Sequence, residues 1–228
     1  MTYLSDKINS LNSDQKNLFG QMQISHGFGY RSHDLVSLFE KTNKISTFMT
    51  KLEKQSLIDT LRYDSNKYKG DGFEFLVEIF LKSHAYDNRI GITNYEPVQT
   101  EDNGVDGIGI NLSNEKCVIQ VKYRQNNKSF LSANEDKLSN MISDGMFQHG
   151  VSATPDKLKM ITEKKSAPLH YVITTASGLH HYTDSENFKG YVHCIGYDHL
   201  RLMLDNNLSF WNLCRQIVSN IQKSKNSK

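Results

Sequence analysis

The most regular alternation of hydrophobic and polar positions lies in residues 116–124, KCVIQVKYR. Side chains two residues apart on a β-strand point to the same face, so this period predicts a strand with two unlike faces. One face carries Cys117, Ile119, Val121 and Tyr123, and the other carries Val118, Gln120, Lys122 and Arg124. Residues 105–112, VDGIGINL, predict a second strand, and the turn formers SNEK join the two strands into a half-buried hairpin.

The rest of the chain after residue 70 alternates between the strand period and the helix period. Strands are predicted in residues 95–100, 169–176 and 191–197, and helices in residues 72–84, 132–150, 198–206 and 209–221. Asp71 is expected to cap the first of these helices, and Ser132 with Glu135 has the spacing of a capping box. Strands that alternate with helices are typical of an α/β fold around a mixed sheet.

Residues 1–68 instead show only helical spacing. Helices are predicted in residues 14–24, in residues 32–41 with Ser32 or Asp34 as the cap, and in a segment whose hydrophobic positions run from Ile45 to Leu61. HGFGY at 26–30 is interpreted as a loop, and SNKYKGDG at 65–72 as a polar hinge. We therefore expect a small helical N-terminal region, residues 1–68, followed by the main domain, residues 69–228. The first region is either a cap on the main domain or a module that contacts DNA or dimerises.

Composition narrows the class of protein. The 228 residues include 27 Lys and Arg against 25 Asp and Glu, so nucleic acid would have to bind a local basic patch. No apolar run approaches the roughly 18 residues of a membrane span, and the opening MTYLSDKINS lacks the regions of a signal peptide. The three cysteines form no closely spaced pair, which favours structural thiols in a reducing compartment. We expect a cytoplasmic protein.

Lys122 is the first candidate for chemistry, because an ammonium group on a strand is costly to desolvate unless it has partners or stays near water. Two carboxylates are candidate partners: Asp106, at the start of the preceding strand, and Glu74, at the start of the helix in residues 72–84. With the Gln120 amide they form an oxygen-only ligand set, so we expect Glu74, Asp106 and Gln120 to bind Mg²⁺, with Mn²⁺ able to substitute. Lys122 would orient the attacking water or stabilise charge developing on a phosphate.

At these residues the chain resembles the PD-(D/E)xK nuclease superfamily, and within it the Mrr-like restriction endonucleases. The matching segments are GDGFEFLVEIFL at 70–81, NGVDGIGI at 103–110 and VIQVKYR at 118–124, and the resemblance covers about residues 68–215. It implies a restriction-endonuclease-like core, a central mixed sheet flanked by helices, and catalytic roles for Glu74, Asp106, Gln120 and Lys122. It also implies Mg²⁺-dependent hydrolysis of DNA that leaves 5′-phosphate and 3′-hydroxyl ends.

The sequence departs from the family pattern at two positions. Val105 stands where the strict pattern has proline, and Gln120 stands where glutamate is more frequent. A neutral amide oxygen is a weaker metal ligand than a carboxylate, although the glutamine form is similar to that of the Mrr-like branch.

Each site residue also has a structural interpretation. Glu74 could close a capping interaction with Asp71, and Glu78, one helical turn later, could take the place of Glu74. Asp106 could be a turn residue, and Lys122 could lie at a solvated strand edge.

The expected partner is DNA, with a homodimer left open. Candidate DNA contacts are Arg124, Lys128, Lys157 and Lys159, although the cluster KLKMITEKK at 157–165 could equally be a solvated helix face. No Walker loop is present, so no nucleotide cofactor is expected, and the histidine spacing matches no zinc pattern. The sequence thus predicts a metal-dependent DNA endonuclease. The alternatives are a Holliday-junction resolvase or other structure-specific DNA nuclease, and a catalytically silent DNA-binding or assembly module.

Overall fold

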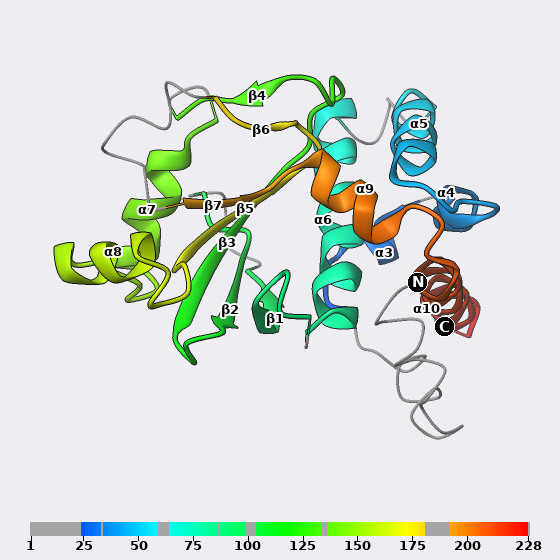
Figure 1. Ribbon diagram of the computed structural model, residues 1–228. Helices are drawn as coiled ribbons and strands as arrows, with labels where there is room; N and C mark the ends of the chain where they lie inside the picture. The colour runs from blue at the N-terminus through cyan, green and yellow to red at the C-terminus, as the bar shows by residue number, and fades with distance from the viewer. Residues whose placement is uncertain are drawn as a thin grey trace. The chain divides into compact units, whose positions relative to one another are not determined.

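The computed structural model of the protein describes residues 24–32, 34–58, 64–85, 87–98, 104–133, 136–180 and 192–227. Contacts divide the chain into two compact units (Figure 1). The first unit contains residues 1–83 and 200–228, and the second contains residues 84–199. This grouping differs from the boundary expected at residue 68, because helix α6, Ser65–Ser83, runs through that position without a break. The helix predicted in residues 14–24 lies outside the described residues, apart from Ile24.

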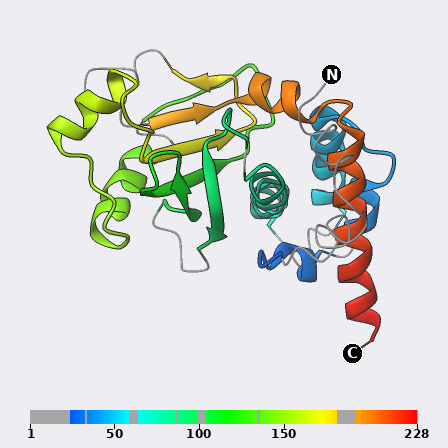
Figure 2. The same ribbon diagram turned by 60° about the horizontal axis from the view of Figure 1, so that its bottom comes forward.

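The first unit is helical and has an aromatic core. Its helices are α3 (Phe28–Arg31), α4 (Leu35–Phe39), α5 (Ile45–Ser56), α6 and α10 (Leu208–Asn226). Helix α10 lies beside α4 (Figure 2). The Trp211 ring lies 6.5 Å from the rings of both Phe39 and Phe48, measured between centroids. The Asp34 side chain accepts a hydrogen bond from the Ser37 N–H at 3.1 Å, which confirms the predicted cap.

Two local predictions for this unit were wrong. HGFGY is not wholly a loop, because α3 begins at Phe28. The polar hinge at 65–72 is the first part of α6, so Asp71 is a buried residue inside the helix and not its cap. Asp64 takes the capping role by accepting a hydrogen bond from the Lys67 N–H at 2.9 Å. Gly72 serves close packing in this helix, because a Cβ there would lie 2.5 Å from Leu52 Cδ1.

Gly70 and Gly72 should therefore respond oppositely to alanine. Gly70→Ala is expected to stabilise the protein by about 0.5–1 kcal/mol, because alanine favours the helix and nothing lies within 4 Å of the new Cβ. Gly72→Ala should be net destabilising, because overpacking the buried Leu52 and Phe28 costs about 1–3 kcal/mol. Urea denaturation of both variants measures the difference. Equal shifts in the free energy of unfolding would contradict this account of Gly72.

The second unit is built on a five-stranded mixed sheet, as predicted. The strands lie in the order β1 (Ile92–Pro97), β2 (Gly107–Asn111), β3 (Lys116–Lys122), β5 (His170–Thr174) and β7 (Val192–Ile195) (Figure 1). β1, β2 and β3 pair antiparallel, whereas β3, β5 and β7 pair parallel. Two short strands, β4, Phe130–Leu131, and β6, Gly178–Leu179, form a separate parallel pair. The protein is thus an α/β protein with a mixed central sheet.

Helices α7, Leu138–Phe147, and α8, Pro155–Thr162, belong to the same unit, and α7 packs on β3 and β5. Leu138 and Met141 of α7 form a hydrophobic core with Val118 and Val172 of the sheet. Residues 117–121 of β3 are all buried, so this strand is not half-buried as expected, whereas β2 alternates between buried and partly buried residues. The predicted capping box was also wrong, because α7 begins only after Lys137, which makes no side-chain capping hydrogen bond.

The remaining helix, α9, Tyr197–Leu204, spans the boundary between the two units in sequence. No helix within the described ranges has the length and apolar character needed to span a membrane.

Candidate active site

The β2–β3 hairpin places Asp106 directly opposite Gln120. Gly107 pairs with Ile119, and one residue further the Asp106 N–H donates to the Ile119 carbonyl at 2.9 Å. The Val121 N–H donates to Asp106 Oδ2 at 2.6 Å. Opposed residues of an antiparallel pair share a face, so the hairpin places Asp106 and Gln120 across from each other, with Lys122 two residues further along β3. The backbone fixes the Asp106 carboxylate at the end of the ladder.

Gln120 is the most unusual residue of this hairpin. Its side chain is fully buried, and neither Oε1 nor Nε2 has a hydrogen-bond partner among the residues that the structure describes. Burying an amide without partners costs about 1–3 kcal/mol on the scale of protein mutational data. Buried polar groups are otherwise almost always satisfied, so this amide indicates a position kept for something other than stability.

A pocket of about 160 Å³ opens beside Gln120. It is lined by Gly104, Gln120, Lys122, Arg124, Asp136, Lys137 and Asn140. Lys122 is partly buried, and its ammonium group makes no ion pair within the described part of the chain. Asp106 does not line the pocket, because its carboxylate turns toward the Val121 N–H. The predicted catalytic lysine and glutamine therefore face a space that could admit a small ligand.

Arg124 borders this pocket and is held by the protein itself. Its guanidinium forms an ion pair with the buried Asp136, whose other carboxylate oxygen accepts the Ser132 N–H at 2.6 Å. The Arg124 N–H also donates to Thr175 Oγ1 at 2.6 Å. Asp136 thus orients a cation at the rim of the pocket, a role that its position before α7 did not reveal.

Glu74 and Glu78 both lie on α6, in the first unit, and the structure separates their roles. Glu78 is fully buried, and its carboxylate accepts hydrogen bonds from the N–H and Oγ of Ser25 and from the His26 N–H, at 2.8–2.9 Å. Lys82 completes the set with an ion pair at 2.8 Å. These donors make Glu78 a structural residue, because they replace the water that its charge loses on burial.

Glu74 keeps about a quarter of its side chain exposed, and its Oε2 lies 3.0 Å from His26 Nε2. Its capping interpretation is excluded, because Asp71 is not a helix cap. Glu74 belongs to the first unit and Asp106 to the second, so their joining in one site stays a prediction.

His26, Asp71 and Glu74 form a cluster whose potential metal-ligand atoms lie within 4.8 Å of one another. The hydrogen bonds of the His26 ring argue against a role as a metal ligand. The Phe28 N–H donates to His26 Nδ1 at 3.2 Å, so in the neutral ring the proton sits on Nε2 and points to Glu74. A metal at Nε2 would need the opposite tautomer. We therefore interpret His26 as a hydrogen-bond donor that orients Glu74.

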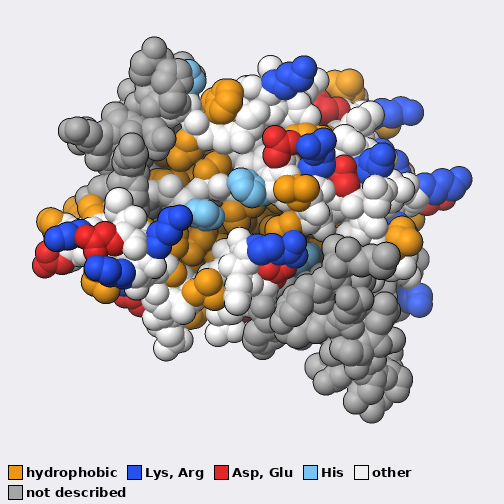
Figure 3. All heavy atoms as spheres, in the orientation of Figure 1, with side chains coloured by type: hydrophobic (Ala, Val, Ile, Leu, Met, Phe, Trp, Pro, Cys, Tyr) orange, Lys and Arg blue, Asp and Glu red, His pale blue; other side chains and the backbone are white. Residues whose placement is uncertain are grey.

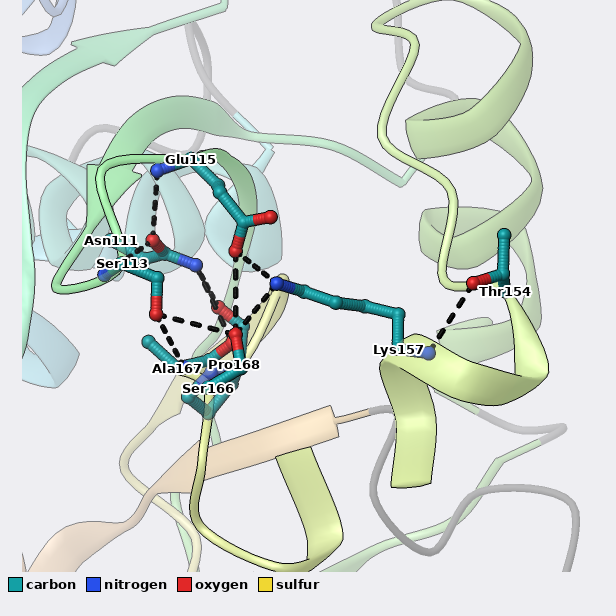
Figure 4. A network of polar contacts seen from close by, with 8 residues as sticks. All are labelled: Asn111, Ser113, Glu115, Thr154, Lys157, Ser166, Ala167 and Pro168. Atoms are coloured by element: carbon teal, nitrogen blue, oxygen red, sulfur yellow. Dashed lines mark hydrogen bonds and ion pairs between the residues drawn. The ribbon is translucent and has the colours of Figure 1, made fainter. Parts of the chain in front are cut away.

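The four side chains predicted to contact DNA differ in their contacts within the protein and in their exposure. Lys157 Nζ pairs with Glu115 and donates to Ser166 Oγ at 2.6 Å, within a network that holds the turn before β5 (Figure 4). This network accounts for Lys157 without DNA. Lys128 and Lys159 are exposed, and Arg124 is partly exposed.

The charged surface agrees with the near balance of the composition. On the face shown in Figure 3, Lys and Arg side chains are scattered, with Asp and Glu among them, and form no continuous basic band. The basic side chains on this face therefore form only local groups.

The cysteines take no part in the candidate site. All three are free thiols, and burial raises the pKa of Cys117 and of Cys194 to about 12. A thiol with so high a pKa stays protonated at neutral pH and is a poor nucleophile, which agrees with their interpretation as structural thiols.

Sequence reasoning missed His26, Asp136, Lys137 and Asn140. His26 lies 48 residues from Glu74, and no local pattern links the two. The only available signal for the other three was their position just before or within the helix that follows the QxK strand. Comparisons with protein-family models, with curated proteins and with solved structures each find no match.

Proposed function

We propose that the protein is a metal-dependent DNA endonuclease. The observation that carries this proposal is the buried Gln120 amide, without a partner among the described residues, beside Lys122 in a pocket and opposite Asp106. A carboxylate, an amide oxygen and an ammonium group are the groups that phosphodiester hydrolysis needs, since it must place a hard cation and stabilise negative charge. They belong to the three hairpin residues, Asp106, Gln120 and Lys122, for which the nuclease resemblance implies catalytic roles.

The residues fit a hard cation. Asp106 offers a carboxylate that the Val121 N–H orients, and Gln120 Oε1 is an oxygen donor without a partner in the described chain. Glu74 would add a third oxygen ligand from α6, oriented by His26. Oxygen-only donor sets favour Mg²⁺, which when bound supplies positive charge that polarises the phosphodiester.

Lys122 would act on the substrate directly. Its ammonium group would donate hydrogen bonds to a phosphate oxygen or to the attacking water, and hold them while charge develops on the phosphate. The side chain is suited to this because it is partly buried, beside the pocket, and has no ion pair among the described residues. Hydrolysis on this plan would leave a 5′-phosphate and a 3′-hydroxyl.

A cleavage assay decides between the endonuclease and its alternatives. Purified protein would be incubated with supercoiled plasmid and with labelled four-way junctions, in Mg²⁺ and in EDTA. Nicking or linearisation of plasmid in Mg²⁺ supports the proposal, whereas cleavage of junctions alone favours a resolvase. Binding of either DNA without cleavage under any metal condition would identify a silent DNA-binding module.

The choice of metal gives a separate prediction. Mg²⁺ and Mn²⁺ should support cleavage, and Ca²⁺ should support DNA binding with little turnover, because its coordination is larger and more flexible than that of Mg²⁺. The measurement is an initial rate with each ion beside a binding curve in Ca²⁺. Undiminished cleavage in EDTA would contradict the assignment of Asp106 and Gln120.

A further inference from the structure

We propose that the pocket beside Gln120 binds a phosphate group, and that Lys137, just before α7, and Asn140 of α7 are two of its ligands. Both residues line the pocket, and both lie outside the segments that resemble the nuclease family. This inference rests on the proposed function, because it takes DNA as the source of the phosphate. It extends the site from the hairpin to the first turn of a neighbouring helix.

The charge of the pocket favours an anion. Among the residues that the structure describes, three cationic side chains line it, those of Lys122, Arg124 and Lys137, against the single carboxylate of Asp136. That carboxylate is already engaged by Arg124 and by the Ser132 N–H. The lining therefore carries an excess of two positive charges, three minus one, which a phosphate would balance.

Gln120 gives independent evidence for a ligand. Its Nε2 is a buried donor without a partner among the described residues, and phosphate oxygens are strong acceptors. A glutamate here would repel a phosphate, whereas an amide can turn its oxygen to a cation and its N–H groups to an anion. The pocket of about 160 Å³ is many times the roughly 10–15 Å³ that a single water needs on the same measure, so a phosphate group has room in it.

The residues at the start of α7 also favour binding of an anion. Lys137, the residue before the helix, has φ 54° and ψ 34°, a left-handed conformation that is uncommon outside glycine. It is exposed, and its ammonium group makes no ion pair in the part of the chain that the structure describes. Asn140 lies in the first turn, where the N–H end of the helix dipole also favours an anion.

The loop before β2 packs closely against the first turn of α7 at Gly104. Gly104 has φ 101°, and a Cβ there would lie 2.9 Å from the Met141 nitrogen and 3.1 Å from Asn140 Cβ. Only glycine fits both the conformation and the space, so the loop before β2 sits against the first turn of α7.

The test measures binding without catalysis. The full-length protein would bind a labelled DNA duplex in EDTA at several salt concentrations, as wild type, Lys137→Asn, Asn140→Ala and Lys116→Ala. Asparagine tolerates the left-handed conformation and removes the charge. Lys116 is the matched control, because it is an exposed lysine of β3 that does not line the pocket.

Lys137→Asn should weaken binding about tenfold and reduce the slope of log K against log salt by about one, the value of one phosphate contact. Asn140→Ala should weaken binding without changing the slope, because it removes no charge. Lys116→Ala should change neither. Circular dichroism melting curves confirm that each variant is folded.

A competition arm separates the two sources of phosphate. If the pocket takes a terminal phosphate, inorganic phosphate and a 5′-phosphorylated strand should displace the duplex from wild type but not from Lys137→Asn. If it takes a backbone diester, neither should compete better than sulfate. A wild-type affinity and salt slope in folded Lys137→Asn would overturn the inference, even in a protein that cleaves DNA. Binding that depends on Lys137 in a protein that never cleaves would sustain the inference and defeat the proposed function.

Discussion

Replacing Lys122 with alanine is expected to reduce the rate of DNA cleavage by about 10²–10³-fold, the usual loss when one preorganised donor is removed from a developing charge. The fold should survive, because the Lys122 side chain is partly exposed and makes no ion pair with the described residues. Cleavage of plasmid under single-turnover conditions measures the loss, and a duplex-binding curve in Ca²⁺ shows how much affinity remains.

Lys116→Ala is the control for this experiment. It removes the same side chain from the exposed first position of the same strand, away from the pocket, so its rate should match that of the wild type. If folded Lys122→Ala cleaves as fast as the control, Lys122 has no part in the mechanism and its position beside Gln120 is structural.

The second large effect separates two carboxylates on α6. Glu74→Gln is expected to lower metal-dependent cleavage by about 10²-fold or more, at least the loss seen for groups that only support a metal ligand. Its stability should be nearly unchanged, because the glutamine oxygen can still accept the hydrogen bond from His26 Nε2. Glu78→Gln should do the reverse. It places an amide N–H₂ among the donors of Ser25 and His26 and removes the charge that pairs with Lys82, which should lower the free energy of unfolding by about 3 kcal/mol.

Two measurements on each variant, a cleavage rate at saturating Mn²⁺ and a urea denaturation curve, distinguish these outcomes. Glu163→Gln is the control for stability, because Glu163 forms a surface ion pair with Lys165 and its loss should change the free energy of unfolding by less than about 1 kcal/mol. An inactive but stable Glu78→Gln beside an active Glu74→Gln would exchange the two roles.

The sequence predicted the parts of the fold that depend on regular periods. The alternation in residues 116–124 identified β3 and its faces, and with the later strands it indicated a mixed sheet. The same period placed Asp106, Gln120 and Lys122 on one hairpin. These predictions hold because a two-residue period is a local property of the backbone.

Helix starts and long-range partners could not be predicted in this way. The polar segment at 65–72 was predicted to be a hinge, yet it is helical. Gly72 stands there because Leu52 fills the space of a side chain, and only packing reveals that. Glu78 was an alternative to Glu74 in the sequence. In the structure its carboxylate accepts hydrogen bonds from Ser25 and His26, which are 53 and 52 residues away. The pairing of Glu74 with Asp106 and the nuclease activity remain predictions.

The first unit is assembled from both ends of the chain, and this order has a consequence for synthesis. A ribosome makes chains from the N-terminus at roughly 5–20 residues per second, so the second unit is complete before α10 leaves the exit tunnel. Trp211 on α10 contacts the rings of Phe39 and Phe48, which lack this part of their packing until α10 has been synthesised. A premature stop codon before residue 208 would therefore release a product with an intact sheet and an exposed aromatic surface, which is the kind of chain that chaperones retain and proteases remove.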